Sequence, residues 1–471
     1  MRSKLFPVPW PIIEHWSISQ QKALQEKKLH EFMHVLNISA FYNSFFKVHS
    51  MNPSKIKTMN DLAKLPFTSK KDLVPSREHP EKPSTFVLDP TNEMKSVVSG
   101  FQLMFSKKLK EDLIFEFKPV DAHFTAGRSA PSIPVFYTQY DLIHMEEAAM
   151  RMMRYLKMPH TVRIINLYPS TPQLPFWYTV YATKHLGIFC LQTGKLLNTK
   201  RILDNIESMQ AEVLIGMPSY VYYLILKAVE DQRKLSGVQL LVLSGEGMTI
   251  KYINKIKHLL SLCDADNVSV YTTYGFAEGK VLWTQCHEDS GYHLYPDMEY
   301  VEIVDEDGNR VPDGQSGEIV YTGIGFRGTA FLRYKTGDIG RMQIGPCPYC
   351  GAKTPRLEPA ILRSSDIIPL QLTKVKQTYV DFNALAALLS SLEFVQQWHL
   401  ILKKQKGVDV VDAEIVLAPS IEQTYAKNEI VREIKSRFGF APEIIFIKEE
   451  TLLHQIRLEN TMTEKKISDR R

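Results

Sequence analysis

The chain has 471 residues, of which 44% are hydrophobic, and its formal net charge is +5 at pH 7. This length and composition predict a globular protein of roughly two to four domains. The charges are spread rather than gathered in one basic stripe, so we expect no nucleic-acid partner, and no apolar run is long enough for a membrane span. Because the proline-broken N-terminus is unlike a secretory leader and five cysteines are too few for a disulfide scaffold, we expect a cytoplasmic protein.

Two structural patterns follow each other along the first three quarters of the chain. The first hundred residues are predicted to be mainly helical, and either Ser17 or Ser19 can cap the first long helix. Between residues 163 and 274, short apolar runs alternate with helical periods in a βαβα order. After Glu278 the pattern changes to antiparallel strands that turn at residues 307–308. This part of the chain is therefore predicted to be mixed α/β.

The last hundred residues have a pattern of their own. They read helix, strand, strand, helix, strand, and the predicted elements are residues 383–392, 398–405, 412–419, 428–438 and 443–449. A set of this size can fold as a separate small domain. We therefore predict a large domain over residues 1–362 and a small α+β domain over residues 363–471.

Two short strings carry acidic residues that suit a bound nucleotide. They are Tyr-Gly-Phe-Ala-Glu at residues 274–278 and Tyr-Lys-Thr-Gly-Asp at residues 334–338. The carboxylate of Glu278, next to a flexible Tyr-Gly turn, can reach a hard cation such as magnesium that bridges phosphate oxygens. Asp338, directly after a glycine, can accept hydrogen bonds from both hydroxyls of a ribose. Because either string alone is also ordinary turn sequence, only their combination predicts an ATP site.

In their order along the chain and in their residues, these strings resemble the motifs of the adenylate-forming superfamily of acyl-CoA synthetases, and within it those of the phenylacetate-CoA ligase family. The resemblance extends to residues 65–73, 241–249 and 298–340 and covers most of the chain. It implies an α/β fold in which a large multi-subdomain adenylation domain precedes a small, mobile α+β lid domain. It also implies ATP-dependent activation of a carboxylic acid as an acyl adenylate, followed by transfer to coenzyme A. Two alternatives stay open: transfer to a carrier-protein thiol or an amine, and a nucleotide-binding pseudoenzyme.

The resemblance also implies roles for single residues around the nucleotide. Glu278 is expected to hold magnesium, and Asp338 is expected to bind the ribose. Glu246 can also be an acid at the start of the helix that follows it, a role that is compatible with contact to the nucleotide. Further residues expected at the nucleotide are Gly245, Glu246, Tyr274 and Gly275.

The predicted phosphate loop lies within residues 123–138 and departs from the family pattern. The threonine and serine hydroxyls of this loop, its glycine backbone and its arginine side chain suit a polyphosphate. The family's lysine and second glycine are absent. Weaker ATP binding, a different mode of ATP binding and a plain polar turn therefore stay open. The candidate phosphate ligands are Thr125, Gly127, Arg128 and Ser129.

The predicted lid hinge follows Arg363, which is expected to contact the ribose or a phosphate. Ser365 replaces the family's first hinge acid, and Asp366 keeps the second. The family's C-terminal lysine is assigned to Lys465, with Lys466 as an alternative, although strict register places Thr463 at that position. A basic tail that is simply solvated is the alternative.

An apolar pocket for the acid is expected beside the nucleotide, and it would suit an aryl or other apolar acid. Aromatic residues at helical spacing are also common in protein cores, so a core role is the alternative for each candidate. Coenzyme A is the expected co-substrate, and a homodimer stays open. The candidate pocket residues are Tyr168, Phe176, Trp177 and Met217, together with Tyr274.

Four separated residues have the types and the spacing of a structural zinc site. Cys286 and His293 lie seven residues apart, and Cys347 and Cys350 form a Cys-x-x-Cys flanked by proline and glycine. Three thiolates and one imidazole suit tetrahedral zinc, and a site with no open coordination position is structural. His287 is an alternative ligand to His293. An ordinary buried cysteine and an unliganded thiol pair are the alternative to a metal site.

Overall fold

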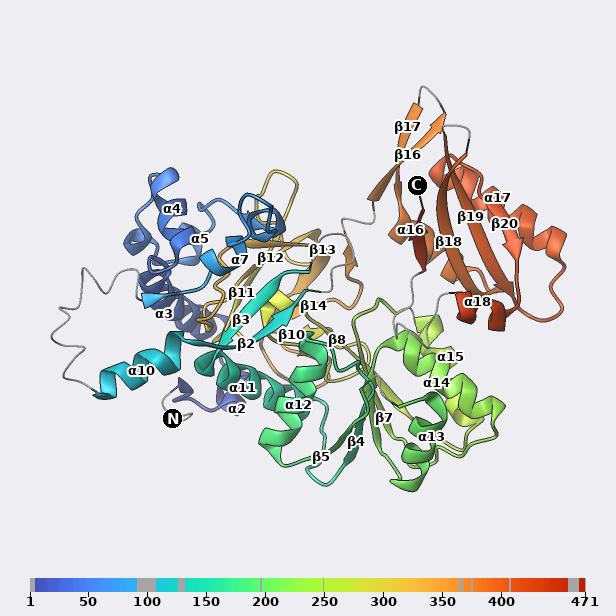
Figure 1. Cartoon of the computed structure of the whole chain (residues 1–471), viewed down its shortest axis with the longest axis horizontal. Helices are drawn as coiled ribbons and strands as arrows, with labels where there is room; N and C mark the ends of the chain where they lie inside the picture. The colour runs from blue at the N-terminus through green and yellow to red at the C-terminus, as the bar shows by residue number, and fades with distance from the viewer. Residues whose placement is uncertain are drawn as a thin grey trace. The chain divides into compact units, whose positions relative to one another are not determined.

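The computed structural model describes most of the chain, and the chain forms two compact units whose elements are labelled in Figure 1. The described residues are 5–90, 107–125, 132–194, 197–248, 250–363, 367–373, 376–405, 408–455 and 466–470. Unit 1 comprises Met1–Asn166, Ser170–Gly194 and Tyr271–Ile361, and unit 2 comprises Leu167–Pro169, Lys195–Val270 and Leu362–Arg471. Because unit 2 also contains residues from the middle of the chain, the domain boundary after residue 362 stays a prediction.

Unit 1 begins with a series of helices, among which α3 (Ile18–Leu36) is the longest. Ser17 caps α3, since its hydroxyl accepts a hydrogen bond from the backbone N–H of Gln20 in a capping box. The buried face of α3 includes Leu29 and Phe32. The other helices of this segment are α2 (Trp10–Ile13), α4 (Ala40–Val48), η1 (Pro53–Lys55), α5 (Met59–Leu62), α6 (Lys70–Leu73) and α7 (Lys82–Thr85). Among the helices that the structure describes, none combines the length and the hydrophobicity that a bilayer span requires.

An antiparallel sheet in unit 1 carries the second acidic string. Its strands follow the order β10-β14-β13-β12-β11, and β13 (Tyr334–Gln343) contains the string. Strand β1 (Thr68–Ser69) pairs in parallel with the start of β13, with Thr68 opposite Tyr334. The Leu-Pro-Phe-Thr-Ser segment of the resemblance therefore lies beside the second string. The remaining strands are β10 (Tyr292–His293), β11 (Tyr300–Val304), β12 (Ser316–Thr322) and β14 (Arg356–Leu357).

The first acidic string begins at the end of β8 (Ser269–Tyr274) and continues into the one-turn helix η3 (Ala277–Gly279). The end of β8 pairs antiparallel with β9 (Trp283–Thr284). Elsewhere in unit 1, β2 and β3 pair antiparallel, and β4 and β5 pair in parallel. The remaining elements of unit 1 are α10 (Lys107–Phe117), β2 (Pro119–Phe124), β3 (Pro134–Thr138), α11 (Gln139–Tyr155), β4 (Arg163–Asn166), α12 (Leu174–Leu186) and β5 (Phe189–Gln192).

The middle of the chain supplies two parallel strands to unit 2, β6 (Val213–Gly216) and β7 (Leu240–Ser244). Every residue of both strands is buried, which explains why they read as continuous apolar runs. Helix α14 (Pro218–Glu230) connects them, so the predicted mixed α/β fold is confirmed. The neighbouring helices are α13 (Thr199–Ser208) and α15 (Ile250–Ser261).

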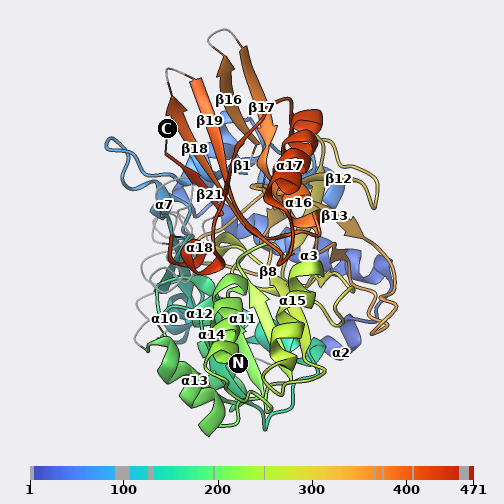
Figure 2. The same cartoon turned by 90° about the vertical axis from the view of Figure 1, so that its right-hand side faces the viewer.

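The C-terminal part of unit 2 contains the predicted αββαβ set. Helices α16 and α17 pack against a sheet with the strand order β20-β19-β18-β21 (Figures 1 and 2), and its core includes Leu389, Leu400 and Ile430. The hairpin of β16 and β17 and the strand β21 were not predicted. Residues 467–469 of the basic tail thus form a strand beside β18 rather than a free solvated end. The elements are β15 (Leu362–Arg363), β16 (Ile367–Thr373), β17 (Lys376–Asp381), α16 (Phe382–Ser391), β18 (Val395–Gln405), β19 (Val408–Leu417), α17 (Gln423–Phe438), β20 (Glu443–Phe446), α18 (Glu449–Gln455) and β21 (Ile467–Asp469).

Candidate functional site

The two acidic strings meet in unit 1 through a crossed pair of hydrogen bonds. The hydroxyl of Tyr334 donates to Glu278 Oε1 over 2.7 Å. The hydroxyl of Tyr274 donates to Asp338 Oδ2, also over 2.7 Å. Each string therefore supplies the tyrosine that holds the acid of the other string. This arrangement brings the two predicted nucleotide ligands to one place in the fold.

Two glycines shape the backbone at this meeting point. A Cβ atom on Gly275 would lie 2.6 Å from the carbonyl oxygen of Val281, which is too close for any side chain. Gly337 has a φ of +74°, a left-handed conformation that favours glycine, directly before Asp338. The backbone N–H of Asp338 donates to Thr336 Oγ1 at 3.0 Å. The Tyr-Gly and Gly-Asp steps are therefore required by the geometry of the two turns.

Both carboxylates are almost entirely buried, with Glu278 8% exposed and Asp338 2% exposed. A buried carboxylate is costly unless it has a cation or hydrogen-bond donors around it. A carboxylate has about four lone-pair sites, and the phenol of Tyr334 occupies one of those on Glu278. Oxygen ligands of this kind suit magnesium, and an aspartate suits paired hydroxyls.

A buried ion pair that the sequence did not reveal anchors the first string. Lys280 Nζ lies 2.8 Å from Asp141 Oδ2, and both side chains are fully buried. Asp141 also accepts hydrogen bonds from the backbone N–H groups of Arg327 at 2.6 Å and Gly328 at 2.7 Å. Burial lowers the pKa of Lys280, and the charge of Asp141 opposes that shift. The pair therefore holds η3, which carries Glu278, against the start of α11 and the Phe-Arg-Gly loop.

The predicted adenine-contacting residues lie in unit 2. Glu246 accepts hydrogen bonds from the backbone N–H of Ser219 at 2.9 Å and from its hydroxyl at 2.8 Å. Ser219 is in the first turn of α14, so the Glu246 carboxylate is held at the start of that helix, and its expected roles at the adenine and at the start of α15 stay predictions. Gly245 has a φ of +94°, and a Cβ there would lie 3.3 Å from Met217 Cε.

The predicted acid-pocket residues are divided between the two units. Phe176 and Trp177 lie on α12 in unit 1, where their rings meet edge to face with centroids 5.3 Å apart. Tyr168 and Met217 lie in unit 2 and are buried. Burial raises the pKa of Tyr168, and a hydrogen bond with Ser244 offsets part of the shift. In both units, the predicted pocket residues are therefore apolar or aromatic.

Thr125 is the one predicted phosphate ligand within the described residues. It is buried directly after β2, and its Oγ1 accepts a hydrogen bond from the backbone N–H of Ile133 at 3.0 Å. The backbone of Arg363 is in β15. The other predicted residues of the loop, hinge and tail lie outside the described part of the chain, namely Gly127, Arg128, Ser129, Ser365, Asp366 and Lys465.

The structure gathers the four predicted metal ligands, Cys286, His293, Cys347 and Cys350, in unit 1. Their ligand atoms all lie within 4.8 Å of one another. His293 Nε2 is 3.3 Å from Cys286 Sγ and 3.7 Å from Cys350 Sγ, and the sulfurs of Cys286 and Cys347 are 3.6 Å apart. The alternative ligand His287 instead stacks on Tyr349, with ring centroids 3.9 Å apart.

These distances fit a tetrahedral metal centre. Zinc bonds of about 2.3 Å to sulfur and about 2.0 Å to nitrogen give tetrahedral edges of about 3.8 Å between sulfurs and about 3.5 Å between sulfur and nitrogen. Three of the six separations, 3.3, 3.6 and 3.7 Å, lie near these values, and all six are within 4.8 Å. His293 Nδ1 lies 3.3 Å from Thr354 Oγ1, which leaves Nε2 directed at the three thiols. The donor set and its geometry therefore suit a structural zinc ion.

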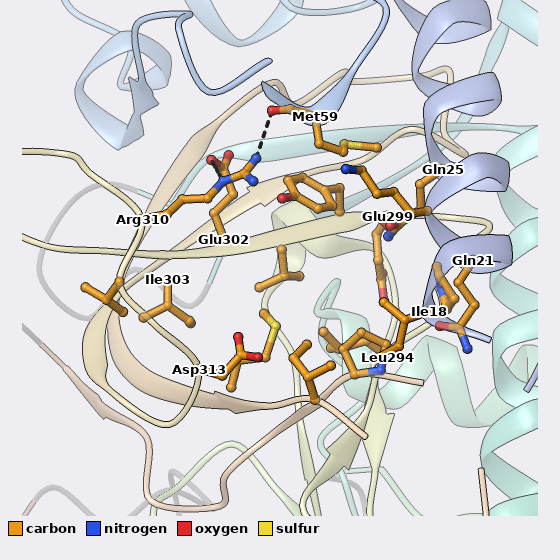
Figure 3. A pocket seen from close by; sticks show the side chains of 18 of the residues that line it. Ile18, Gln21, Gln25, Met59, Leu294, Glu299, Glu302, Ile303, Arg310 and Asp313 are labelled. Carbon is orange, nitrogen blue, oxygen red and sulfur yellow. Dashed lines mark hydrogen bonds and ion pairs between the residues drawn. The ribbon is translucent and has the colours of Figure 1, made fainter. Parts of the chain in front are cut away.

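A separate cavity of about 270 Å³ lies in unit 1 between α3 and β11 (Figure 3). On its wall, Arg310 pairs with Glu302 at 3.0 Å and donates to the carbonyl oxygen of Met59 at 2.9 Å. Gln25 donates to the backbone carbonyl oxygen of Glu299 at 3.0 Å. None of the predicted site residues that the structure describes lines this cavity, so it is distinct from the meeting point of the acidic strings.

Known proteins resemble the chain in sequence. Residues 135–328 match the family model described as AMP-binding enzyme. The phenylacetate-coenzyme A ligase of Thermus thermophilus is 23% identical over 436 residues, covering 89% of this chain and 88% of that protein. The phenylacetate-coenzyme A ligase of Escherichia coli K12 is 23% identical over 457 residues, covering 92% of each chain.

A solved structure resembles the chain in fold. The 2-hydroxyisobutyryl-CoA ligase in its postadenylation state, in complex with R3-HIB-AMP, has a TM-score of 0.73 and 18% sequence identity. The match covers 98% of this chain and 92% of that one.

Proposed function

We propose that this chain, which has the sequence features and the fold of the adenylate-forming enzymes, is an ATP-dependent acid–coenzyme A ligase. In the first step, a carboxylate oxygen of the acid bonds to the α-phosphorus of ATP, and pyrophosphate leaves with the electrons of the broken bond. In the second step, the thiol sulfur of coenzyme A bonds to the carbonyl carbon of the adenylate, and AMP leaves. The observation that carries this proposal is the crossed pair of hydrogen bonds that joins Glu278 and Asp338 to the two tyrosines.

In this proposal, each of the two buried acids binds a different part of the nucleotide complex. Glu278 would hold magnesium, whose charge, when bound, neutralises the phosphate oxygens as pyrophosphate departs. Asp338 would accept the two ribose hydroxyls. Tyr334 and Tyr274 orient these carboxylates before the nucleotide arrives, so little reorganisation is needed on binding.

Further nucleotide contacts belong to the same proposal. Gly275 would let the nucleotide approach the turn after Tyr274, and Gly245 and Glu246 would face the adenine. Thr125 would begin the phosphate loop, continued by Gly127, Arg128 and Ser129. Arg363 would contact the ribose or a phosphate, Lys465 would assist adenylation, and Ser365 with Asp366 would form the hinge of a mobile lid.

The acid is proposed to be aryl or otherwise apolar. This rests on the aromatic pair Phe176 and Trp177 in unit 1 and on the buried Tyr168 and Met217 in unit 2. The names of the phenylacetate-coenzyme A ligases agree with an aryl acid. Transfer to a carrier-protein thiol or an amine and a homodimer stay open as alternatives, and a cytoplasmic location stays a prediction from the sequence.

We also propose that a structural zinc ion binds Cys286, His293, Cys347 and Cys350. Support comes from the distances between their ligand atoms and from the hydroxyl of Thr354 beside His293. Cys286 follows the first acidic string and Cys347 follows the second, so the metal would link the two segments that carry Glu278 and Asp338. Its contribution would therefore be to the stability of the site.

Pyrophosphate release tests the proposal. Purified protein is incubated with ATP, magnesium and a panel of aryl and alkyl carboxylic acids, first without and then with coenzyme A. We expect acid-dependent pyrophosphate release, and a thioester mass when coenzyme A is added. Release without a thioester would favour another acceptor. ATP binding with no release across the whole panel would contradict the ligase and favour the pseudoenzyme.

A further inference from the structure

His123, in β2 of unit 1, is a fully buried histidine whose ring lacks a hydrogen bond. Neither Nδ1 nor Nε2 makes a hydrogen bond of good geometry to a residue that the structure describes. The carboxylate of Asp121 lies 3.4 Å from Nε2, a contact that lowers the pKa of Asp121, but the same oxygen already accepts from Tyr181 at 2.7 Å. Nδ1, on the other side of the ring, has no hydrogen-bond partner among the described residues. An imidazole always has at least one N–H to donate, and buried polar groups are nearly always paired. A ligand group can supply the missing partner.

The surroundings of His123 are aromatic on two sides. Its ring centroid lies 4.5 Å from that of Tyr137 and 6.5 Å from that of Trp177, and the Trp177 plane is only 12° from parallel. The ring of Trp177 also lies 6.1 Å from that of Tyr181. Trp177, Tyr181 and Asp121 are only partly buried, so the cluster extends from His123 to solvent. A flat, apolar ligand with one polar group fits such an environment.

His123 is also close to the proposed reaction centre. It lies in β2, two residues before Thr125, which directly follows the strand. Its neighbour Tyr137 donates a hydrogen bond to the carbonyl oxygen of Ala277 at 3.4 Å, and Ala277 directly precedes Glu278. Trp177 is itself one of the residues proposed for the acid pocket. The unpaired ring therefore lies between the proposed magnesium ligand and the proposed aromatic wall.

We propose that His123 is a specificity-determining residue that hydrogen-bonds a ring hydroxyl on an aromatic acid. This inference rests on the proposed ligase function and names the class of acid more narrowly. A neutral imidazole has one N–H donor and one acceptor nitrogen, and a hydroxyl has both complementary capacities. A site built to hydrogen-bond a hydroxyl discriminates strongly against the analogue that lacks it, because its own polar group is then left unpaired.

The test compares acids that differ only by a ring hydroxyl. Acid-dependent pyrophosphate release is measured for benzoate, phenylacetate and their ortho, meta and para hydroxy derivatives, with the wild type and with His123→Phe. We expect the wild type to prefer at least one hydroxylated acid about tenfold or more in kcat/KM. In His123→Phe this preference should fall below about threefold while the KM for ATP stays unchanged, and His123→Gln should restore part of it.

A second buried histidine of unit 1 provides the matched control. His144 has a partner, since Nδ1–H donates to the carbonyl oxygen of Tyr140 at 2.9 Å, so His144→Phe should leave the preference for hydroxylated acids intact. Thermal melting checks that each variant folds. An unchanged preference in His123→Phe, or an equal loss in His144→Phe, overturns the inference.

The same acids also separate this inference from the ligase proposal. If none of them releases pyrophosphate, the ligase proposal fails for this substrate class. Calorimetric binding then decides the role of His123. Tighter binding of a hydroxylated acid by the wild type than by His123→Phe supports the inference, and equal dissociation constants overturn it.

Discussion

The hydroxyl of Tyr334 donates a hydrogen bond of 2.7 Å to Glu278, a residue 56 positions away in the sequence. Both side chains are buried, and Thr68 of β1 lies opposite Tyr334 in the sheet. The position of the Glu278 carboxylate therefore depends on strand β13, which also carries Asp338. Substituting Tyr334 should therefore affect magnesium binding, whereas substituting Asp338 on the same strand should affect ribose binding.

Removing the Tyr334 hydroxyl should weaken the use of magnesium-bound ATP. We expect Tyr334→Phe to lower kcat/KM for MgATP about tenfold, the effect of losing one hydrogen bond to a charged group. Glu278→Gln should lower it about a hundredfold or more, because the cation then loses its anionic ligand. Pyrophosphate release at varied magnesium measures both effects.

The matched control is Tyr42→Phe, which removes a buried hydroxyl that donates to Ala330 at 3.1 Å and accepts from the N–H of Leu332 at 3.0 Å. It should lower the melting temperature without changing the magnesium dependence. An equal shift in magnesium dependence for both phenylalanine variants would show that Tyr334 has no special role.

Asp338 should be tested through the hydroxyls that it is proposed to bind. We expect Asp338→Ala to raise the KM for ATP about tenfold or more. Removing the 2′ or the 3′ hydroxyl from ATP should impair the wild type but have little further effect on Asp338→Ala, because the partner is already gone. Additive losses from the substitution and from the deoxynucleotide would mean that Asp338 does not contact the ribose.

Zinc content and stability should fall together when one cysteine of the cluster is replaced. Cys347→Ser should lose most of the zinc found by metal analysis and melt about 5 °C or more below the wild type, a loss of a few kcal/mol. A chelator should lower the melting temperature of the wild type but hardly affect the variant. Cys263→Ser, at a buried cysteine outside the cluster, is the control. Metal-free wild-type protein with an unchanged response to chelator would refute the zinc site.

Glu299 should make the protein less stable as pH rises. Burial raises the pKa of Glu299 to about 8 from an ordinary value of 4.5. Between these values the folded protein holds a proton that the unfolded chain has released, so the free energy of unfolding falls with increasing pH. At most about 1.4 kcal/mol is lost per pH unit, or on the order of 5 kcal/mol in all.

Glu299→Gln isolates this effect. The amide keeps the oxygen that accepts from Trp283 Nε1 at 2.5 Å and from the backbone N–H of Tyr295 at 2.8 Å, but it cannot ionise. Measured by denaturant unfolding, the stability of Glu299→Gln relative to the wild type should rise by about 2–3 kcal/mol between pH 6 and pH 8. A constant difference across this range would be inconsistent with the raised pKa.

Local patterns predicted most secondary structure but not the partners that meet across the chain. The alternation of strands and helices and the C-terminal αββαβ set each rest on signals within one segment, and both are confirmed. Of the two predicted caps of the first long helix, the structure has Ser17. Strand β21 has only three residues and no hydrophobic alternation, so only its pairing with β18 reveals it. The contact of Glu246 with Ser219 was not predicted, because the proximity of the two residues depends on how the segments around β6, β7 and α14 pack.

The candidate site shows the same limit. The two acidic strings indicated a shared nucleotide, but nothing local to either string indicates which tyrosine holds which acid. The pair of Lys280 and Asp141 spans 139 positions, and the unpaired ring of His123 depends on side chains from β2, β3 and α12. Such features depend on tertiary contacts, and the periodicity of helices and strands in the sequence does not predict those contacts.

Equilibrium binding of two nucleotides tests the central claim most directly. The dissociation constants of MgATP and of AMP without magnesium are measured by calorimetry for the wild type, Glu278→Gln and Asp338→Asn, each checked for folding. If the two acids serve one nucleotide, Asp338→Asn weakens the binding of both ligands, whereas Glu278→Gln weakens that of MgATP alone. Folded variants that bind MgATP as tightly as the wild type would contradict the account.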